Sequence, residues 1–206
     1  LGTGTPSPDP ERSGPATAVV VNGTPYLIDF GPGVVRRIAA ASQAGVKGLS
    51  VGNVRVAFLT HLHSDHTIGY ADLILTPWSV RRSQPLEVYG PKGLKHKTSH
   101  VLEAYREDIA IRRRDKHVLG VPEQEDGYRV HVHEINPGTV YKDHNVTVKA
   151  FLVNHGDVPK AFGYRIETPD RAIVISGDAA PSESVIDSCN GCDVLIHEAY
   201  SMMTYN

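Results

Sequence analysis

The sequence has few cysteines, no long apolar segment and no excess of positive charge. Its 206 residues include two cysteines and one tryptophan, and the formal net charge is −2. No run of about eighteen apolar residues occurs, so no membrane span is predicted. The charge balance gives no support for binding a polyanion through counterion release. We find no repeat, low-complexity run or linker, and the 40% hydrophobic content suits a single domain over residues 1–206.

The two cysteines, Cys189 and Cys192, form a Cys-Asn-Gly-Cys segment before an apolar stretch. A redox or zinc pair would require a strand–helix–strand context or a second CxxC, and neither is found. A plain turn is therefore the favoured interpretation. The chain begins at Leu1 rather than Met, so we expect that a preceding segment was removed or left out. A cytoplasmic location is favoured, with export as the alternative if that segment was a signal peptide.

Side chains that bind metals are concentrated in His61-Leu-His63-Ser-Asp65-His66. The motif follows the apolar run Val54–Leu59, which predicts a buried strand with the motif on the loop at its C-terminal end. His61 and His63 are expected to project to the same side and to chelate one ion. Asp65 and His66 are expected to point to a neighbouring position. Imidazole and carboxylate ligands together favour zinc and similar ions.

Two later strands also end in a potential metal ligand. His155 follows the apolar run Phe151–Val153, and Asp178 follows the run Ala172–Ser176 after one glycine. Strand ends of one sheet can converge on a common edge, so both side chains are candidates for the same metal centre. Taken alone, an aspartate after glycine is also typical of a turn or a helix N-cap.

Together these motifs resemble the metallo-β-lactamase superfamily, and they are most similar to its ribonuclease Z branch. The segments that carry the resemblance are Leu1–Pro6, Tyr26–Gly33, the HxHxDH motif at 61–66, His155-Gly156, Ser176-Gly-Asp178 and His197–Ala199. The resemblance extends from residue 1 to about residue 200. It implies an α/β fold, the four-layer αββα sandwich of the metallo-β-lactamase type, lacking its C-terminal part.

The resemblance also implies a dinuclear metal site and hydrolytic chemistry. It assigns ligands to the two ions as follows: His61, His63 and His155 to one, Asp65 and His66 to the other, and Asp178 as the bridge. Asp65 is in addition expected to be catalytic, because it would orient the nucleophile. The expected cofactors are two zinc ions, with manganese or iron as alternatives. A hydroxide that bridges the two ions would attack the substrate.

The family pattern includes elements that this sequence does not contain. A further histidine ligand of the second ion and a proton-donating His-Thr/Ser motif are expected beyond Asn206, because His197 is the last histidine. His197 follows an apolar run, so a buried supporting role is favoured over proton donation. The glycine- and proline-rich arm with which ribonuclease Z proteins hold tRNA is not found either.

Apolar periodicity and turn signals predict strands that alternate with helices. Asn22-Gly23 between two apolar runs predicts a hairpin, and Val34–Ala44 before Gly45 predicts a helix. Further helices are expected over Ala71–Arg82, Gly93–Arg114 (as one helix) and Pro181–Ser188. Further strands are expected at Leu86–Tyr89, Tyr128–Ile135, Thr139–Tyr141, Val146–Val153, Ala161–Thr168, Arg171–Ser176 and Asp193–Glu198. Sheets flanked by helices, with hairpins in each half, favour the αββα sandwich.

Histidines and cations outside the metal motif have simpler interpretations. The cluster Arg112–His117 is a candidate for phosphate contacts, but a solvated helix end is favoured because cations complement the helix dipole there. His96 and His100, one helical turn apart, have no third ligand nearby. His131 and His133 share one face of a strand, with no carboxylate at a suitable spacing. Both pairs are interpreted as surface residues.

Three functions remain open. The first is a metal-dependent phosphodiesterase of the ribonuclease Z type, whose substrate is a nucleic-acid phosphodiester or a small ester. The second is an acyl hydrolase of the same fold that acts on a lactone, a thioester or a β-lactam. The third is a non-catalytic or redox metal protein, although diiron redox relatives tend to have Glu where this chain has His63. No membrane partner is expected, and a homodimer is left open.

Overall fold

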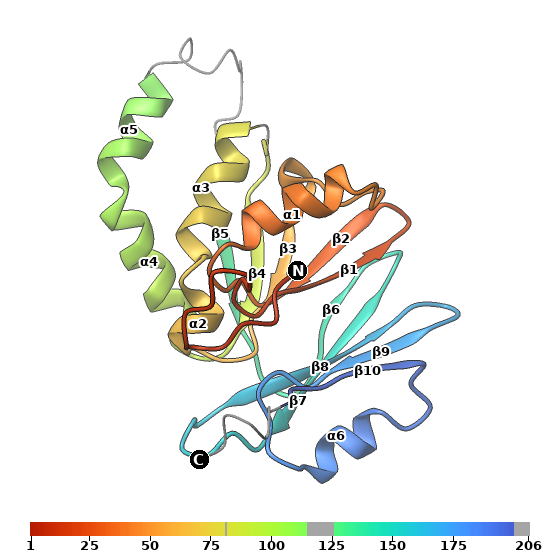
Figure 1. Ribbon diagram of the computed structural model, residues 1–206. Helices are drawn as coiled ribbons and strands as arrows, with labels where there is room; N and C mark the ends of the chain where they lie inside the picture. The colour runs from red at the N-terminus through yellow and green to blue at the C-terminus, as the bar shows by residue number, and fades with distance from the viewer. Residues whose placement is uncertain (81, 115–125, 200–206) are drawn as a thin grey trace. The chain divides into compact units, whose positions relative to one another are not determined.

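The computed structural model describes residues 1–80, 82–114 and 126–199 (Figure 1). It divides into two compact units, Leu1–Glu134 and Ile135–Asn206. The single domain over residues 1–206 stays a prediction, because two compact units can belong to one domain. Of the cluster Arg112–His117, the last three residues, Asp115, Lys116 and His117, lie outside the described residues.

The first unit is built on a five-stranded sheet with the order β1-β2-β3-β4-β5. The strands are β1 Thr17–Val21, β2 Thr24–Ile28, β3 Val56–Phe58, β4 Leu86–Gly90 and β5 Val130–Glu134. The predicted hairpin between β1 and β2 is confirmed, and Asn22 and Gly23 have the positive φ angles of 50° and 78° that a tight hairpin turn requires. The other strand pairs are parallel.

The four parallel strands of this sheet end at a common edge. Ile28, Phe58, Tyr89 and His133 lie in register across β2, β3, β4 and β5. The loops that leave these strands therefore start side by side at one edge of the sheet, which we call the carboxyl edge. In sheets with parallel strands this edge is where binding residues collect.

Helices of the first unit bury one face of the sheet. They are α1 Val34–Gln43, η1 Val51–Asn53, α2 Ser64–Thr67, α3 Tyr70–Val80, α4 Leu94–Ala104 and α5 Arg106–Arg114. One apolar cluster joins Leu27, Ala57 and Val88 of the sheet to Ile38 of α1 and Leu73 of α3. The alternation of buried and half-buried residues along β4 shows that its other face is not part of this core.

The prediction of one continuous helix over Gly93–Arg114 is wrong, because the helix is interrupted at Tyr105 (Figure 1). Tyr105 has φ −104° and ψ 13°, outside the helical range. The sequence of α5 explains the interruption: Glu107 and Asp108 lie in its first turn and arginines in its last. The acidic residues complement the helix dipole at the start of α5, and the arginines complement it at the end. The sequence of α5 therefore favours a separate helix that begins after Tyr105.

A buried arginine completes the backbone hydrogen bonds of α3. Pro77 lies inside α3 and has no N–H to donate to the carbonyl of Leu73. Arg82 is 1% exposed, and its Nη1 donates to Leu73 O at 2.9 Å and its Nη2 to Ile74 O at 2.6 Å. Its Nε and Nη2 also donate to Gly127 O. Burial lowers the pKa of Arg82 to about 10, so the guanidinium is charged at neutral pH.

The second unit is built on another five-stranded sheet, with the order β10-β9-β8-β7-β6. Its elements are β6 Gly138–Lys142, β7 Thr147–Val153, β8 Ala161–Glu167, β9 Ala172–Ile175, α6 Glu183–Ser188 and β10 Val194–Ile196. Strands β6 to β9 form antiparallel pairs, while β10 is parallel to β9. The strands and the helix predicted for this half of the chain are all present.

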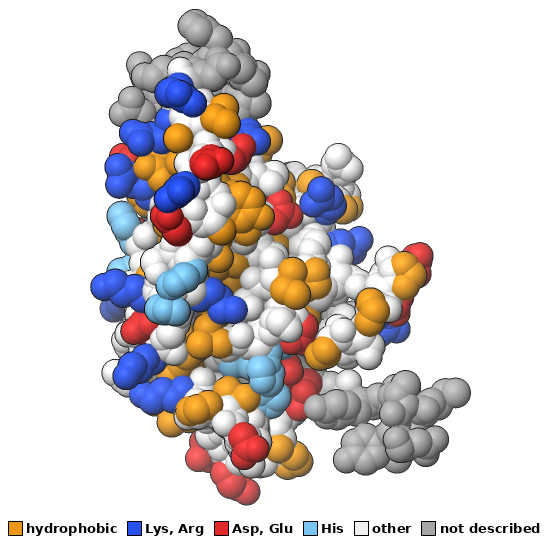
Figure 2. All heavy atoms as spheres, turned by 90° about the vertical axis from the view of Figure 1, so that its left-hand side faces the viewer, with side chains coloured by type: hydrophobic (Ala, Val, Ile, Leu, Met, Phe, Trp, Pro, Cys, Tyr) orange, Lys and Arg blue, Asp and Glu red, His pale blue; other side chains and the backbone are white. Residues whose placement is uncertain are grey.

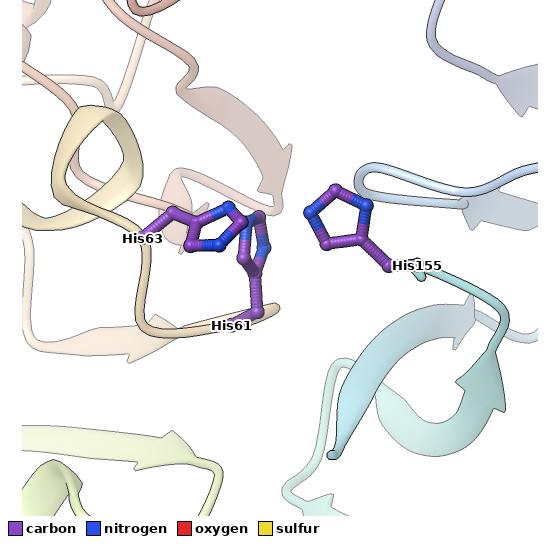
Figure 3. A group of neighbouring side chains, drawn as sticks. All are labelled: His61, His63 and His155. Atoms are coloured by element: carbon purple, nitrogen blue, oxygen red, sulfur yellow. The ribbon is translucent and has the colours of Figure 1, made fainter. Parts of the chain in front are cut away.

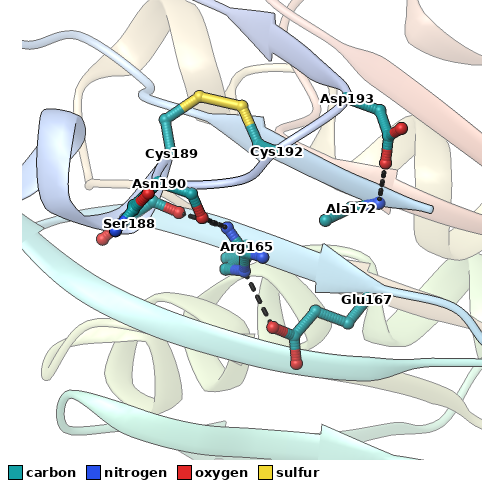
Figure 4. The surroundings of a disulfide bond; sticks show 8 residues. All are labelled: Arg165, Glu167, Ala172, Ser188, Cys189, Asn190, Cys192 and Asp193. Atoms are coloured by element: carbon teal, nitrogen blue, oxygen red, sulfur yellow. Dashed lines mark hydrogen bonds and ion pairs between the residues drawn. A yellow bond between two sulfur atoms is a disulfide. The ribbon is translucent and has the colours of Figure 1, made fainter.

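A disulfide that was not expected from the sequence closes the turn between α6 and β10. Cys189 and Cys192 are bonded to each other, and Cys192 N–H donates to Cys189 O at 2.8 Å. The interpretation as a plain turn is therefore incomplete, since a turn of this length brings the two side chains together. Arg165 supports the same segment through hydrogen bonds from Nη1 to the carbonyls of Ser188 and Asn190 (Figure 4).

Among the described helices, none combines the length and the apolar character that crossing a membrane requires.

The carbonyl contacts of Arg82 lead to a prediction about stability. Arg82→Met removes the donors of three buried carbonyl groups while it keeps an apolar stem of similar length. We expect the free energy of unfolding to fall by about 3 kcal/mol, measured by urea denaturation. The matched control is Arg36→Met, because the Arg36 side chain is 82% exposed and its loss should change stability by less than about 0.5 kcal/mol. Equal stabilities of the two variants would contradict the role of Arg82.

Candidate metal centre

A buried carboxylate lies at the carboxyl edge of the first sheet, directly after β2. Asp29 is 4% exposed, and its φ of 59° is unusual for a residue other than glycine. Its Oδ1 accepts hydrogen bonds from Thr60 N at 2.8 Å and from Thr60 Oγ1 at 3.0 Å. Its Oδ2 accepts from His66 Nδ1 at 2.8 Å. Asp29 thus joins the end of β2 to Thr60, which precedes the metal motif, and to His66, which ends it.

These contacts determine which nitrogen of each imidazole carries the proton. An ionised carboxylate only accepts hydrogen bonds, so His66 must hold its proton on Nδ1 and present the lone pair of Nε2. Thr60 Oγ1 donates to Asp29, and its oxygen therefore accepts from His61 Nδ1 at 3.0 Å. His61 accordingly also presents the lone pair of Nε2. Metal-binding histidines are commonly oriented in this way by a carboxylate or a hydroxyl group.

The loop after β3 brings three imidazoles close together. The ring centroids of His61 and His63 are 4.5 Å apart, and those of His61 and His66 are 4.2 Å apart. A ring nitrogen of His61 lies within 4.8 Å of one on each of the other two rings. His63 immediately precedes α2 and is exposed, and Figure 3 shows its ring beside that of His61. The predicted proximity of His61 and His63 is confirmed.

Burial distinguishes the members of this loop. His61 and His66 are 0% and 1% exposed, and Asp65 is 7% exposed. Asp65 Oδ2 lies 3.6 Å from His66 Nε2, so the carboxylate and the imidazole of these two neighbours lie side by side. The Nε2 atoms of His61 and His66 are both buried. Buried imidazole and carboxylate groups that point to a common place are the donor set that zinc prefers.

The two ligands predicted in the second unit lie on adjacent loops. His155 follows β7 (labelled in Figure 3), and Asp178 follows β9 after Gly177, whose φ is 63°. A hydrogen bond from Ala180 N to Asn154 O, at 2.8 Å, joins the two loops. The second unit therefore holds an imidazole and a carboxylate at neighbouring strand ends, each half-buried.

The predicted burial of His197 is wrong. His197 is exposed, because β10 is the outer strand of its sheet and its residues Val194, Leu195 and Ile196 are themselves 47%, 45% and 39% exposed. Its neighbour Glu198, for which no role was predicted, contacts the loop that carries Asp178. Glu198 Oε1 accepts a hydrogen bond from Ala179 N at 3.0 Å and thereby supports the loop of Asp178.

The histidine pair on β5 has a carboxylate partner that the sequence spacing did not reveal. Glu87, on the adjacent strand β4, accepts from His131 Nδ1 and from His133 Nε2, each at 2.7 Å. The ring of His133 also stacks on Tyr89. Burial alone would raise the pKa of Glu87, but the hydrogen bonds from His133 and His131 outweigh it and hold the pKa below its ordinary value of 4.5. On α4, His96 and His100 are an exposed pair, as expected.

Comparisons with known proteins place this geometry in a family. The family described as "Beta-lactamase superfamily domain" matches residues 24–204. The protein named Ribonuclease Z of Mycobacterium marinum is 36% identical over 200 residues, which are 96% of this chain and 68% of that protein. The Ribonuclease Z of Mycobacterium bovis is 35% identical over the same shares. This chain thus spans about two thirds of the length of these relatives.

Solved structures agree with the sequence comparison. The short form of human tRNase Z has a TM-score of 0.68 and 26% identity, over 94% of this chain and 74% of that one. A metallo-β-lactamase fold protein from Bacillus subtilis has a TM-score of 0.67 over 94% of this chain and 66% of that one. Because its identity is 14%, the second likeness concerns the fold alone.

The lowered pKa of Glu87 predicts a pH-dependent contribution to stability. A carboxylate with a lowered pKa stabilises the folded state above its ordinary pKa, and this contribution is lost as the pH falls through the lowered value. We expect Glu87→Gln to reduce stability by about 0.5 kcal/mol at about pH 6, the range for partly exposed pairs, and the difference to shrink as the pH falls below 4.5 and Glu87 takes up a proton. Thermal unfolding of both proteins across this range is the measurement. A difference that persists unchanged at low pH would contradict the ionic origin of the effect.

Proposed function

Because this chain belongs to the β-lactamase superfamily, in its ribonuclease Z branch, we propose that it hydrolyses phosphodiester bonds with a dinuclear zinc centre. Membership of the family confirms the predicted α/β fold of the metallo-β-lactamase type and makes the chain a metal-dependent hydrolase. What we propose beyond this is the number of ions, their identity as zinc and the phosphodiester substrate. The observation that carries it is the network of Asp29, Thr60 and His66, which presents imidazole Nε2 atoms as ligands.

We assign His61, His63 and His155 to one ion, Asp65 and His66 to the other, and Asp178 to the bridge between them. The donors fit zinc, because three imidazoles form one set and carboxylates complete the other. Manganese or iron would tolerate the carboxylates as well, so the metal needs a direct measurement. The support for these assignments is the family pattern together with the contacts within each unit.

The residues of this chain would each contribute a definite part of the reaction. When bound, zinc ions lower the pKa of a coordinated water to about 7 and polarise a substrate oxygen. Asp65 would orient the attacking water through a carboxylate that is already buried beside His66. Asp29 and Thr60 hold the protons on Nδ1 of the two buried histidines, so that these rings need not reorganise during turnover. Asp178 would maintain the separation of the two ligand sets.

A phosphodiester is favoured over a lactone, a thioester or a β-lactam as the substrate. The curated relatives at 34–36% identity carry the name Ribonuclease Z, which supports a nucleic-acid phosphodiester, with a small ester as the simpler alternative. Among the described residues, no contact specifically favours an acyl hydrolase or a redox protein. The homodimer stays a prediction.

The metal assignment is tested by removing the most exposed ligand. His63→Ala should lose most of the metal at its site. Its turnover of bis-p-nitrophenyl phosphate should fall by at least about 10²-fold, a loss typical of removing one catalytic element. Elemental analysis after dialysis measures the first effect and initial rates measure the second. His144→Ala is the matched control, since His144 is an exposed residue between β6 and β7.

Two outcomes of this experiment would count against the proposal. Full retention of metal by His63→Ala would refute the ligand assignment. Hydrolysis of nitrocefin or a homoserine lactone by the metal-loaded protein, without hydrolysis of the phosphodiester, would show that the chain is an acyl hydrolase.

The role of Asp29 predicts a second effect on the metal. Asn tolerates the positive φ at this position, so Asp29→Asn should keep the fold while an uncharged amide replaces the acceptor of His66 and Thr60. We expect the affinity for zinc to fall by about 10- to 100-fold, measured by competition with a chelator. Asp72→Asn is the control, because Asp72 pairs with Arg36 away from this network. An affinity equal to that of the unchanged protein, with circular dichroism also unchanged, would show that Asp29 does not orient the ligands.

A further inference from the structure

Helix α4 is in direct contact with the loop after β3 that carries residues 61–66, which we call the metal loop. Leu62, which lies between the two chelating histidines, packs against Gly93 at the start of α4: a Cβ added to Gly93 would come within 2.9 Å of Leu62 Cδ1. One turn later, Lys97 Nζ donates to Thr67 Oγ1 at 3.0 Å, and this hydroxyl donates to His63 O at 2.8 Å. A molecule bound along α4 would therefore extend directly from the metal loop.

The segment that contains α4 and α5 concentrates positive charge in a chain that is acidic overall. Residues 92–114 include seven lysines and arginines and three acidic residues, a net charge of +4, so the rest of the chain carries −6 of the total of −2. Two of the three acidic side chains are paired with arginines: Glu103 of α4 with Arg106 of α5, and Asp108 with Arg112 within α5. Figure 2 shows this face, on which cationic and histidine side chains gather.

An open pocket of about 700 Å³ lies at the start of α4, at the carboxyl edge of the sheet. Its lining residues are Lys92, Gly93, Lys95, His96, Ser99 and Glu134. The carboxylate of Glu134, the last residue of β5, accepts from Gly93 N at 2.7 Å and from Lys95 N at 3.2 Å. These hydrogen bonds, with the charges of Lys92 and Lys95, lower the pKa of Glu134. Glu134 thus occupies the backbone N–H groups, whereas the exposed ammonium groups of Lys92 and Lys95 face solvent.

We propose that Lys92, Lys95 and His96 form a surface that binds the phosphate backbone of single-stranded RNA next to the metal loop. The proposal rests on the proposed function, because it assumes that the scissile bond of the same RNA lies at that loop. A polymer fits better than a single small anion, because the cationic residues continue along α5 to Arg112, Arg113 and Arg114. Helices of 11 and 9 residues together extend about 30 Å, which is enough for several phosphates.

This local concentration of charge changes the interpretation of the sequence. Taken alone, the net charge of −2 gives no support for binding a polyanion, and the arginines of α5 fit a solvated helix end. Electrostatic attraction depends on the charges near the binding surface, because charges more than about 8 Å away are largely screened at physiological salt. The acidic remainder of the chain would therefore not prevent binding at α4.

The test measures binding of a short fluorescein-labelled single-stranded RNA by anisotropy over a series of salt concentrations. The double variant Lys92→Gln/Lys95→Gln should bind more weakly. Its plot of log affinity against log salt should be less steep by about 1.4, since each lost contact with a single strand contributes about 0.7. The matched control is Lys47→Gln/Lys142→Gln, which removes the same charge from two exposed lysines elsewhere and should leave the slope unchanged.

A third variant gives an effect of the opposite sign. Glu134→Gln keeps an acceptor oxygen for Gly93 N and Lys95 N but removes the negative charge, so binding of RNA should become tighter. Equal slopes for the two double variants would overturn the proposal, as would weaker binding by Glu134→Gln with circular dichroism unchanged. Inorganic phosphate that displaces RNA completely from the unchanged protein at matched ionic strength would also overturn it, by showing a site for one small anion.

Binding is measured without turnover, so this test is separate from that of the proposed function. A protein that binds RNA through Lys92 and Lys95 but hydrolyses no phosphodiester would refute the proposed function alone. A phosphodiesterase whose affinity for RNA does not depend on these lysines would refute the surface alone.

Discussion

The hydrogen bonds of one buried carboxylate, Asp29, determine which atoms of the metal loop can bind an ion. A buried charge is costly unless hydrogen bonds compensate it, and here the compensating donors are the backbone N–H and hydroxyl of Thr60 and the imidazole of His66. The same bonds fix the protons of His61 and His66 on Nδ1. The cost of burying Asp29, and of its φ of 59°, is offset only if β2 and the loop after β3 stay in their observed register. The ligand geometry and the sheet therefore depend on each other.

The remainder of the first unit supports this arrangement from outside. Parallel pairing aligns Ile28, Phe58 and Tyr89, so the loops after β2, β3 and β4 start together at the carboxyl edge. Helix α4 then packs on the metal loop through Gly93 and Leu62, and this contact places the lysines of α4 next to the imidazoles. One edge of one sheet thus combines the imidazoles and the carboxylate of the HxHxDH motif with a cationic surface, which is the combination that the proposed phosphodiesterase would need.

Local signals in the sequence were sufficient for most of the elements and for the central motif. HxHxDH is contiguous, so its position after an apolar strand could be recognised without any long-range contact, and Asn22-Gly23 predicted its hairpin for the same reason. Two of the missed features are local: the break at Tyr105 between α4 and α5 and the disulfide between Cys189 and Cys192. The other missed features depend on pairing between distant segments. Glu87 meets His131 and His133 only because β4 and β5 are adjacent, and Asp29 meets His66 across 37 residues. The exposure of His197 likewise follows from the position of β10 at the edge of its sheet, which an apolar run does not reveal.

The most direct measurement is the protonation state of the ring nitrogens of His61 and His66, from assigned nitrogen-15 NMR spectra of the metal-free protein at neutral pH. If Asp29 controls the ligand atoms, both rings carry their proton on Nδ1, and Asp29→Asn changes this distribution for His66 and for His61 through Thr60. Protons on Nε2 of both rings in the unchanged protein, or spectra that do not respond to Asp29→Asn, would contradict it.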